Sequence, residues 1–131
     1  MPNDNRKPKV LVIDDDESIC QLIIDLLENE EVDVTSAIDG LRGMRLFRQN
    51  PADLVITDIV MPGMEGLEII RDLKKNYPDT EIIVISGASG EYIDHAKVFG
   101  ARHIFVKPFD VKTLLSTVRK ILEDIKVKRQ S

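Results

Sequence analysis

The fold of this chain is indicated by a short stretch near its N-terminus, residues 10–18, which reads VLVIDDDES. Its first four residues are apolar and mostly β-branched, as in a short strand that is buried on both faces. Three aspartates and a glutamate follow directly. Carboxylates this close repel one another and raise each other's pKa. They lie either in a solvated turn or beside a positive group from elsewhere in the chain, and this stretch alone leaves both interpretations open.

The same change from a short apolar run to a helical stripe recurs along the chain. The runs that predict strands are 10–13, 32–37, 54–57, 82–85 and 104–106. Apolar residues three and four positions apart predict helices over 19–27, 41–47, 67–73, 91–99 and 111–125. Strands that alternate with helices form a parallel sheet with helices on both faces. We therefore predict an α/β fold, doubly wound and flavodoxin-like, with five parallel strands in the order 2-1-3-4-5.

Individual residues mark the ends of several of these elements. Asp16, Asp39 and Asp110 each precede a helical stripe, where an aspartate side chain can cap the first free N–H groups. The run VDVTSA, residues 32–37, alternates apolar and polar residues, which is typical of a strand with one solvated face. We therefore expect the second strand to lie at an edge of the sheet.

Length and composition indicate a single globular domain. The chain has 131 residues, and its 18 Lys and Arg against 23 Asp and Glu give a net charge of −5, which argues against a general nucleic-acid-binding protein. It has no apolar run of membrane length and no apolar secretory signal. Cys20 lies in a helical apolar stripe, which indicates a buried structural thiol in a cytoplasmic protein. We expect an extended or disordered segment at 1–8, one domain at 9–125 and a frayed tail at 126–131.

Polar side chains stand at the ends of four of the predicted strands. Asp14 and Asp15 follow the first strand, Asp58 the third, Ser86 the fourth and Lys107 the fifth. Because the carboxyl ends of parallel strands meet at one edge, these side chains should converge. Three carboxylates suit Mg²⁺, and a lysine with a hydroxyl suits a phosphoryl group. Asp58 is the best candidate nucleophile, since it stands alone on the central strand and a carboxylate can form an acyl phosphate.

Four pieces of the sequence, VLVIDDDES, VITDIVMPGMEG, VISGAS and GARHIFVKPF, occur in an order and spacing that resemble a known family. The chain is similar to the receiver domain of bacterial two-component response regulators, and in particular to single-domain receivers of the chemotaxis type. The resemblance covers roughly Lys9 to Ile125. One piece alone would be a weak signal, whereas four pieces in register are specific to this family.

The resemblance implies a role for each residue at the predicted site. Asp14 and Asp15 would be an acid pair that binds Mg²⁺, with Mn²⁺ as a substitute and Asp15 as the more direct ligand. Asp58 would be a further ligand and the phosphoacceptor, forming 4-aspartylphosphate. The remaining implied positions are the backbone carbonyl of Val60 as a metal ligand, Ser86 as a switch hydroxyl, Lys107 as a contact of the phosphoryl group, and Pro108 in a cis Lys107-Pro108 bond.

The implied function is that of a phosphoprotein switch in a two-component pathway or phosphorelay. Asp58 would take a phosphoryl group from a phosphohistidine of a sensor histidine kinase or a histidine phosphotransfer protein. The domain would then bind a downstream target protein with changed affinity, without nucleic-acid or membrane partners. It would not be an enzyme apart from its own phosphorylation and dephosphorylation. KVKRQS, at 126–131, is too short for an output domain, so a stand-alone and an excised receiver are both open.

A small Mg²⁺-dependent phosphatase resembling the haloacid dehalogenase family is the alternative. Asp14-x-Asp16 superficially fits the D-x-D start of that family, which also uses an aspartate nucleophile. However, no acidic pair follows Lys107 at a strand end, because Glu123-Asp124 lies within the last predicted helix. A cap domain is not evident at this length. Steady turnover of a phosphomonoester would favour the enzyme, and stoichiometric labelling would favour the switch.

One position departs from the receiver pattern. Receivers usually carry Tyr or Phe three residues before the lysine that corresponds to Lys107, and this chain has Ile104 there. Phe105 is aromatic but one residue late, and neighbouring residues of a strand point to opposite faces. We therefore expect Phe105 to pack as ordinary core under a helix. Activation should then move the loop at 86–90 and the helix at 91–99, with little aromatic rotation.

Overall fold

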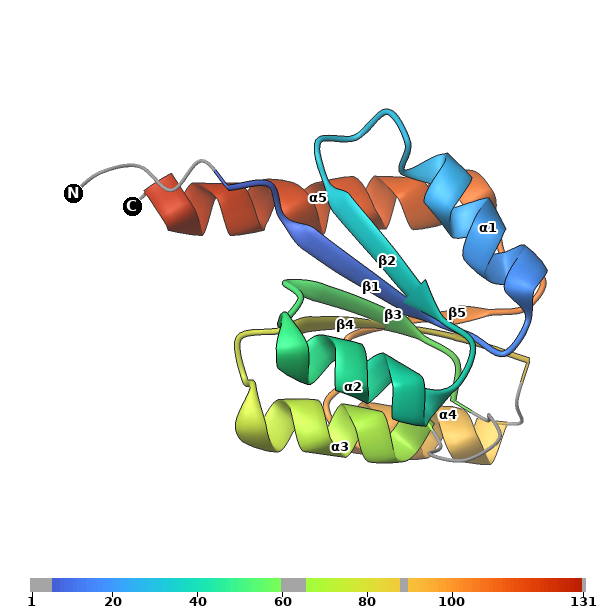
Figure 1. Ribbon diagram of the computed structural model, residues 1–131. Coiled ribbons are helices and arrows are strands. Elements are labelled where there is room, and N and C mark those ends of the chain that lie inside the picture. The colour runs from blue at the N-terminus through green and yellow to red at the C-terminus, as the bar shows by residue number, and fades with distance from the viewer. Residues whose placement is uncertain (1–5, 60–65, 88–89, 131) are drawn as a thin grey trace.

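The structure is a computed structural model that describes residues 6–59, 66–87 and 90–130. Its five strands are β1 Lys9–Ile13, β2 Asp33–Ala37, β3 Leu54–Thr57, β4 Glu81–Ser86 and β5 His103–Val106. All neighbouring strands are parallel, and their order in the sheet is β2-β1-β3-β4-β5 (Figure 1). The predicted fold class, strand order and edge position of the second strand are confirmed.

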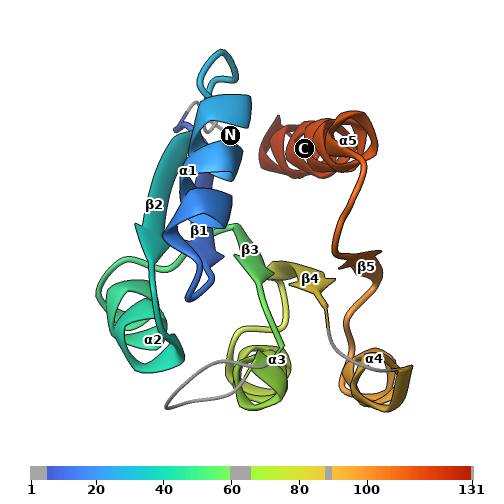
Figure 2. The same cartoon turned by 90° about the vertical axis from the view of Figure 1, so that its right-hand side faces the viewer.

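Five helices cover the two faces of the sheet. They are α1 Glu17–Leu26, α2 Gly40–Gln49, α3 Gly66–Asn76, α4 Gly90–Val98 and α5 Val111–Gln130. Helices α1 and α5 lie on one face, and α2, α3 and α4 lie on the other (Figures 1 and 2). Each strand therefore leads into a helix that packs back onto the sheet, which is the doubly wound arrangement.

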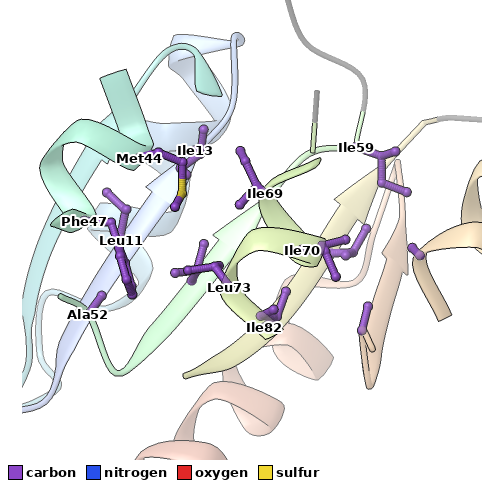
Figure 3. Close-up of a cluster of buried hydrophobic side chains, with 14 residues drawn as sticks. Leu11, Ile13, Met44, Phe47, Ala52, Ile59, Ile69, Ile70, Leu73 and Ile82 are labelled. Atoms are coloured by element: carbon purple, nitrogen blue, oxygen red, sulfur yellow. The ribbon is translucent and has the colours of Figure 1, made fainter. Parts of the chain in front are cut away.

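The alternation of side chains along the strands divides the core into two clusters. Val10 and Val12 of β1 face the cluster beneath α1 and α5. Leu11 and Ile13 face the cluster beneath α2 and α3, where Met44, among others, packs against them (Figure 3). Because β1 and β3 are buried on both faces, their sequences are continuous apolar runs rather than alternating patterns.

Aspartate side chains cap three helices, as the sequence predicted. A carboxylate oxygen of Asp16 accepts a hydrogen bond from the Ser18 N–H at 2.9 Å, and Asp39 accepts one from Arg42 N–H at 2.7 Å. Asp110 accepts from the N–H of the second residue of α5 at 3.0 Å. Each cap satisfies an N–H group that has no partner within its own helix. Asp16 thus caps α1 and is not part of the acid pair formed by Asp14 and Asp15.

The C-terminal end differs from the prediction. The segment 126–131 was expected to be a frayed tail, but α5 continues to Gln130. Arg129 explains the difference, because its guanidinium donates to Asp53 Oδ1 at 2.8 Å and to the Arg6 carbonyl at 2.9 Å. The apolar stripe of this helix ends near Ile125, so hydrophobic periodicity gave no sign of the extension.

The described ends of the chain lie at the side of the molecule where the strands begin (Figure 1), and there Arg129 donates to the Arg6 carbonyl. Of the predicted N-terminal segment 1–8, residues 6–8 are described and form no regular element. The Pro8 carbonyl accepts a hydrogen bond from Asp33 N–H at 3.0 Å, at the start of β2. Within the described part of the chain, no helix combines the length and the apolar character needed to cross a membrane.

Candidate functional site

The polar residues predicted to converge lie together where the strands end. Asp14 follows β1, Asp58 follows β3, Ser86 closes β4 and Lys107 follows β5. Backbone hydrogen bonds continue past the strands and keep these ends in register. Asp58 N–H donates to the Ile13 carbonyl at 3.0 Å, and Lys107 N–H donates to the Ser86 carbonyl at 2.9 Å. The parallel sheet therefore sets the relative positions of the four residues.

Lys107 is the positive group that offsets the acids of residues 10–18. Its Nζ lies 2.9 Å from Asp14 Oδ2 and 3.1 Å from Asp58 Oδ2. Desolvation by itself would lower the pKa of Lys107, but its hydrogen bonds to both carboxylates raise that pKa above its usual value. The ammonium therefore stays charged and bridges the ends of β1 and β3, although it is 93 residues from Asp14 in the sequence.

Three carboxylates form a cluster that fits a divalent cation. One oxygen each from Asp14, Asp15 and Asp58 lies within 4.8 Å of the others. Asp14 and Asp58 are buried, whereas Asp15 is exposed, so the cluster opens to solvent on the side of Asp15. These are the hard oxygen donors that Mg²⁺ prefers. The donor set therefore fits the metal that the sequence predicted.

Burial governs the electrostatics of Asp14. Desolvation raises the pKa of its carboxyl above the usual value, and the negative charge of Asp58 acts in the same direction. The Asp16 N–H, which donates to Asp14 Oδ1 at 2.9 Å, and the Lys107 ammonium oppose this effect. Asp14 is thus held in an environment that disfavours its negative charge and favours an added cation.

Backbone groups orient the Asp58 carboxylate. The Ile59 N–H donates to Asp58 Oδ1 at 2.6 Å, while Oδ2 accepts from Lys107. The hydroxyl of Thr57 donates to the Asp58 carbonyl at 2.9 Å. The sequence did not predict these contacts. Every residue except proline carries a backbone N–H, and no sequence pattern marks which of them reaches a carboxylate. The one available signal was Thr57 itself, a polar residue that ends the apolar strand LVIT.

Three further positions were predicted at the site, namely Ser86, Pro108 and Val60. Ser86 is almost fully buried, at 1% exposure, and its carbonyl accepts the Lys107 N–H. The Lys107-Pro108 bond is cis, as predicted. Val60, whose carbonyl was predicted as a metal ligand, lies outside the described residues.

Ile104 and Phe105 point to opposite faces of β5. Ile104 packs against the cluster beneath α2 and α3. Phe105 packs against the cluster beneath α1 and α5, as expected of an ordinary core aromatic. An aliphatic side chain therefore occupies the face on which receivers usually carry their aromatic ring.

The lone cysteine lies close to the site without belonging to it. Cys20 is buried, and its thiol contacts the Asp14 carbonyl at 3.4 Å. Burial raises the pKa of the thiol, which keeps it protonated. The prediction that this thiol is buried is confirmed.

Comparisons with known proteins identify the family. Residues 10–119 match the family model described as the response regulator receiver domain. The chain is 36% identical over 115 residues to the response regulator ArlR of Staphylococcus saprophyticus, covering 87% of this chain and 52% of that protein. It is 34% identical over 118 residues to the DNA-binding dual master transcriptional regulator RpaA of Synechocystis, covering 88% and 49% respectively. The chain thus spans about half the length of these relatives.

Solved structures agree with this result. The receiver domain of the Francisella response regulator 1452 superposes with a TM-score of 0.81 at 31% identity, covering 91% of this chain and 99% of that one. The chemotaxis response regulator CheY4 of Vibrio cholerae gives a TM-score of 0.80 at 31% identity, with coverage of 88% and 99%. The haloacid dehalogenase alternative receives no support. The chain belongs to the receiver domain family of response regulators, which are phospho-accepting switches in two-component signalling.

Proposed function

We propose that Asp58 is the residue of this receiver that accepts the phosphoryl group. The observation that carries the proposal is the position of its carboxylate. Asp58 follows the central strand, its Oδ2 lies 3.1 Å from the Lys107 ammonium, and it shares a cluster with Asp14 and Asp15. A carboxylate that attacks phosphorus is helped when it is fixed in place beside a positive charge that stabilises the phosphoryl oxygens.

The donor would be a phosphohistidine on a sensor histidine kinase or a histidine phosphotransfer protein. An oxygen of Asp58 attacks phosphorus, so that an O–P bond forms while the N–P bond of the donor breaks. The released imidazole nitrogen takes up a proton from solvent, and Asp58 becomes an acyl phosphate. Lys107, which pairs with Asp14 and Asp58 before transfer, is within reach of the oxygens that arrive on Asp58.

Asp14, Asp15, Asp58 and the Val60 carbonyl would hold Mg²⁺, with Mn²⁺ as a substitute. When bound, the metal supplies positive charge that neutralises the carboxylates and the phosphoryl oxygens. Asp15 is the exposed member of the cluster and gives the metal its access from solvent. The Asp14 side chain helps to place the charge of Lys107 as well as that of the metal.

Phosphorylation would be read by a partner protein at the face formed by α4, β5 and α5. The Ser86 hydroxyl and Lys107 would contact the phosphoryl group and draw in the loop after β4. Val98 and Val106 contribute exposed apolar surface to this region, at 81% and 52% exposure.

The test is stoichiometric labelling with a small phosphodonor. Wild type, Asp58→Asn and the control Asp124→Asn are incubated with Mg²⁺ and acetyl phosphate, and their intact masses are measured. Asp124 lies on α5, away from the strand ends that form the site. Wild type and the control should each gain one phosphoryl group, and Asp58→Asn should gain none. An undiminished gain in Asp58→Asn would place the phosphoacceptor elsewhere.

A further inference from the structure

Thr57 places a buried hydroxyl in an otherwise apolar environment. It is 1% exposed at the end of β3, and its neighbours in the sheet are Ile13 and Val84. Both neighbours face the cluster beneath α2 and α3. A hydroxyl in such a place is costly unless it forms a hydrogen bond. Thr57 meets this need by donating to the Asp58 carbonyl at 2.9 Å.

The same carbonyl is confined from a second side by the start of α3. Gly66 N–H donates to the Ile59 carbonyl at 2.6 Å. A Cβ atom added to Gly66 would lie 1.9 Å from the Asp58 carbonyl oxygen and 2.6 Å from Ile59 Cα. Both are backbone atoms, so a side chain at this position would force the Asp58–Ile59 peptide to move. Thr57 and Gly66 thus hold one peptide unit between them.

That peptide unit also orients the Asp58 carboxylate. The Asp58 carbonyl and the Ile59 N–H belong to the same rigid, planar group, so fixing one end fixes the other. The Ile59 N–H donates to Asp58 Oδ1 at 2.6 Å, and the remaining oxygen, Oδ2, faces Lys107 at 3.1 Å. A hydrogen bond to the carbonyl therefore also determines the orientation of the carboxylate, through the plane of the peptide.

We propose that Thr57 is a positioning residue for Asp58: its hydroxyl holds the Asp58–Ile59 peptide so that the Ile59 N–H keeps the Asp58 carboxylate facing Lys107. The inference rests on the proposed role of Asp58 as phosphoacceptor. Thr57 is not one of the groups proposed to bind the metal or the phosphoryl group, so it acts through Asp58. Its effect is on the rate of phosphoryl transfer, because small displacements of a nucleophile reduce rates steeply.

The experiment compares the removal of two buried threonine hydroxyls. Thr57→Val removes the hydroxyl next to Asp58. Thr80→Val is the matched control, since Thr80 is also buried and its hydroxyl donates to the Ala52 carbonyl at 3.3 Å, where β4 begins at the opposite end of the sheet. Thr57→Ser keeps the hydroxyl and loses only the methyl group. For each variant, the labelling rate with acetyl phosphate at saturating Mg²⁺ and the melting temperature are measured.

We expect Thr57→Val to be labelled on the order of tenfold more slowly than wild type. Thr80→Val should retain the wild-type rate despite a lower melting temperature. Thr57→Ser should also retain the rate despite the cavity that it creates. The rates are compared at a temperature at which all the variants are folded, so that stability and labelling are separated.

The outcomes separate this inference from the proposed function. If wild type is not labelled at Asp58, the proposed function fails, and the role of Thr57 fails with it. If wild type is labelled and Thr57→Val is equally fast, or Thr80→Val is slowed as much, only the positioning role is overturned. If Thr57→Val does not fold, Thr57→Ala takes its place, because alanine also removes the hydroxyl; labelling of Thr57→Ala as fast as that of Thr57→Ser would overturn the positioning role.

Discussion

At the scale of single residues, the site is a balance of buried charges. Asp14 and Asp58 are buried carboxylates that share the Lys107 ammonium, and Asp15 adds a third negative charge from the exposed side. Without a metal, this arrangement costs stability, because two buried carboxylates and one exposed carboxylate face one lysine. A cation that binds there removes the repulsion between the carboxylates, and this relief strengthens its binding.

Asp14→Asn tests this balance. Burial raises the pKa of Asp14, so this carboxyl binds more protons in the native chain than in the unfolded chain just above its usual pKa. Its contribution to the free energy of unfolding therefore falls as the pH rises through that range and stays reduced at neutral pH. Thermal unfolding without metal should show Asp14→Asn melting a few degrees above wild type at pH 7, and the gain should shrink in acid. A lower melting temperature at neutral pH would contradict this view.

At the scale of elements, the sequence predicted most of what the structure shows. Continuous apolar runs identified β1, β3 and β4, and the alternating run identified β2 as an edge strand, because burial determines those patterns. The aspartate caps were predicted correctly for the same local reason. The last turns of α5 were not predicted. Arg129 holds them through a contact to Asp53, which is 76 residues away, and no local pattern encodes such a contact.

The contact between Arg129 and Asp53 gives a prediction for α5. Its charged groups are partly buried, with side-chain exposures of 16% and 25%, so it should contribute about 1 kcal/mol. Arg129→Ala should lower the free energy of unfolding in urea by that amount and speed amide exchange in the last turn of α5. Lys126→Ala, on the exposed surface of the same helix, is the control. Equal effects of the two substitutions would mean that the contact is not what holds the helix end.

The start of α3 gives a second prediction at this scale. A Cβ on Gly66 meets backbone atoms, whereas a Cβ on Gly43 of α2 meets side-chain atoms of Ile13, at 2.5 Å from Cδ1 and 2.8 Å from Cγ1. Gly66→Ala should therefore lower the free energy of unfolding by about 3 kcal/mol or more, and Gly43→Ala by clearly less. Urea titrations of the two variants check the difference. A Gly66→Ala protein as stable as Gly43→Ala would show that the peptide after Asp58 can move freely.

At the scale of the whole molecule, the sheet brings distant parts of the chain to one edge. The sequence predicted which residues meet there, because the order of parallel strands determines which strand ends are neighbours. It did not predict that Lys107 pairs with Asp14 as well as Asp58, or that the Asp58–Ile59 peptide is held by Thr57. Those contacts depend on side-chain directions and on the close approach of α3, which strand order does not specify.

The faces of β5 lead to a prediction about the activated state. Ile104 occupies the face beneath α2 and α3, and Phe105 is part of the opposite cluster. Binding of beryllofluoride to Asp58 should therefore shift the backbone of α4 and the loop before it, while the Phe105 ring keeps its rotamer. Structures with and without beryllofluoride check this point. A large rotation of the Phe105 ring would show that it has taken over the role of the missing aromatic residue.

The central claim is that the phosphoryl group is carried by Asp58, and its most direct test locates the group within the chain. The phosphorylated protein is reduced with borohydride, which converts an aspartyl phosphate to homoserine, and its peptides are sequenced by mass spectrometry. We predict homoserine at position 58 in wild type, dependent on Mg²⁺, and absent without the phosphodonor. Homoserine at another aspartate, or a labelled protein with unmodified Asp58, would contradict the account.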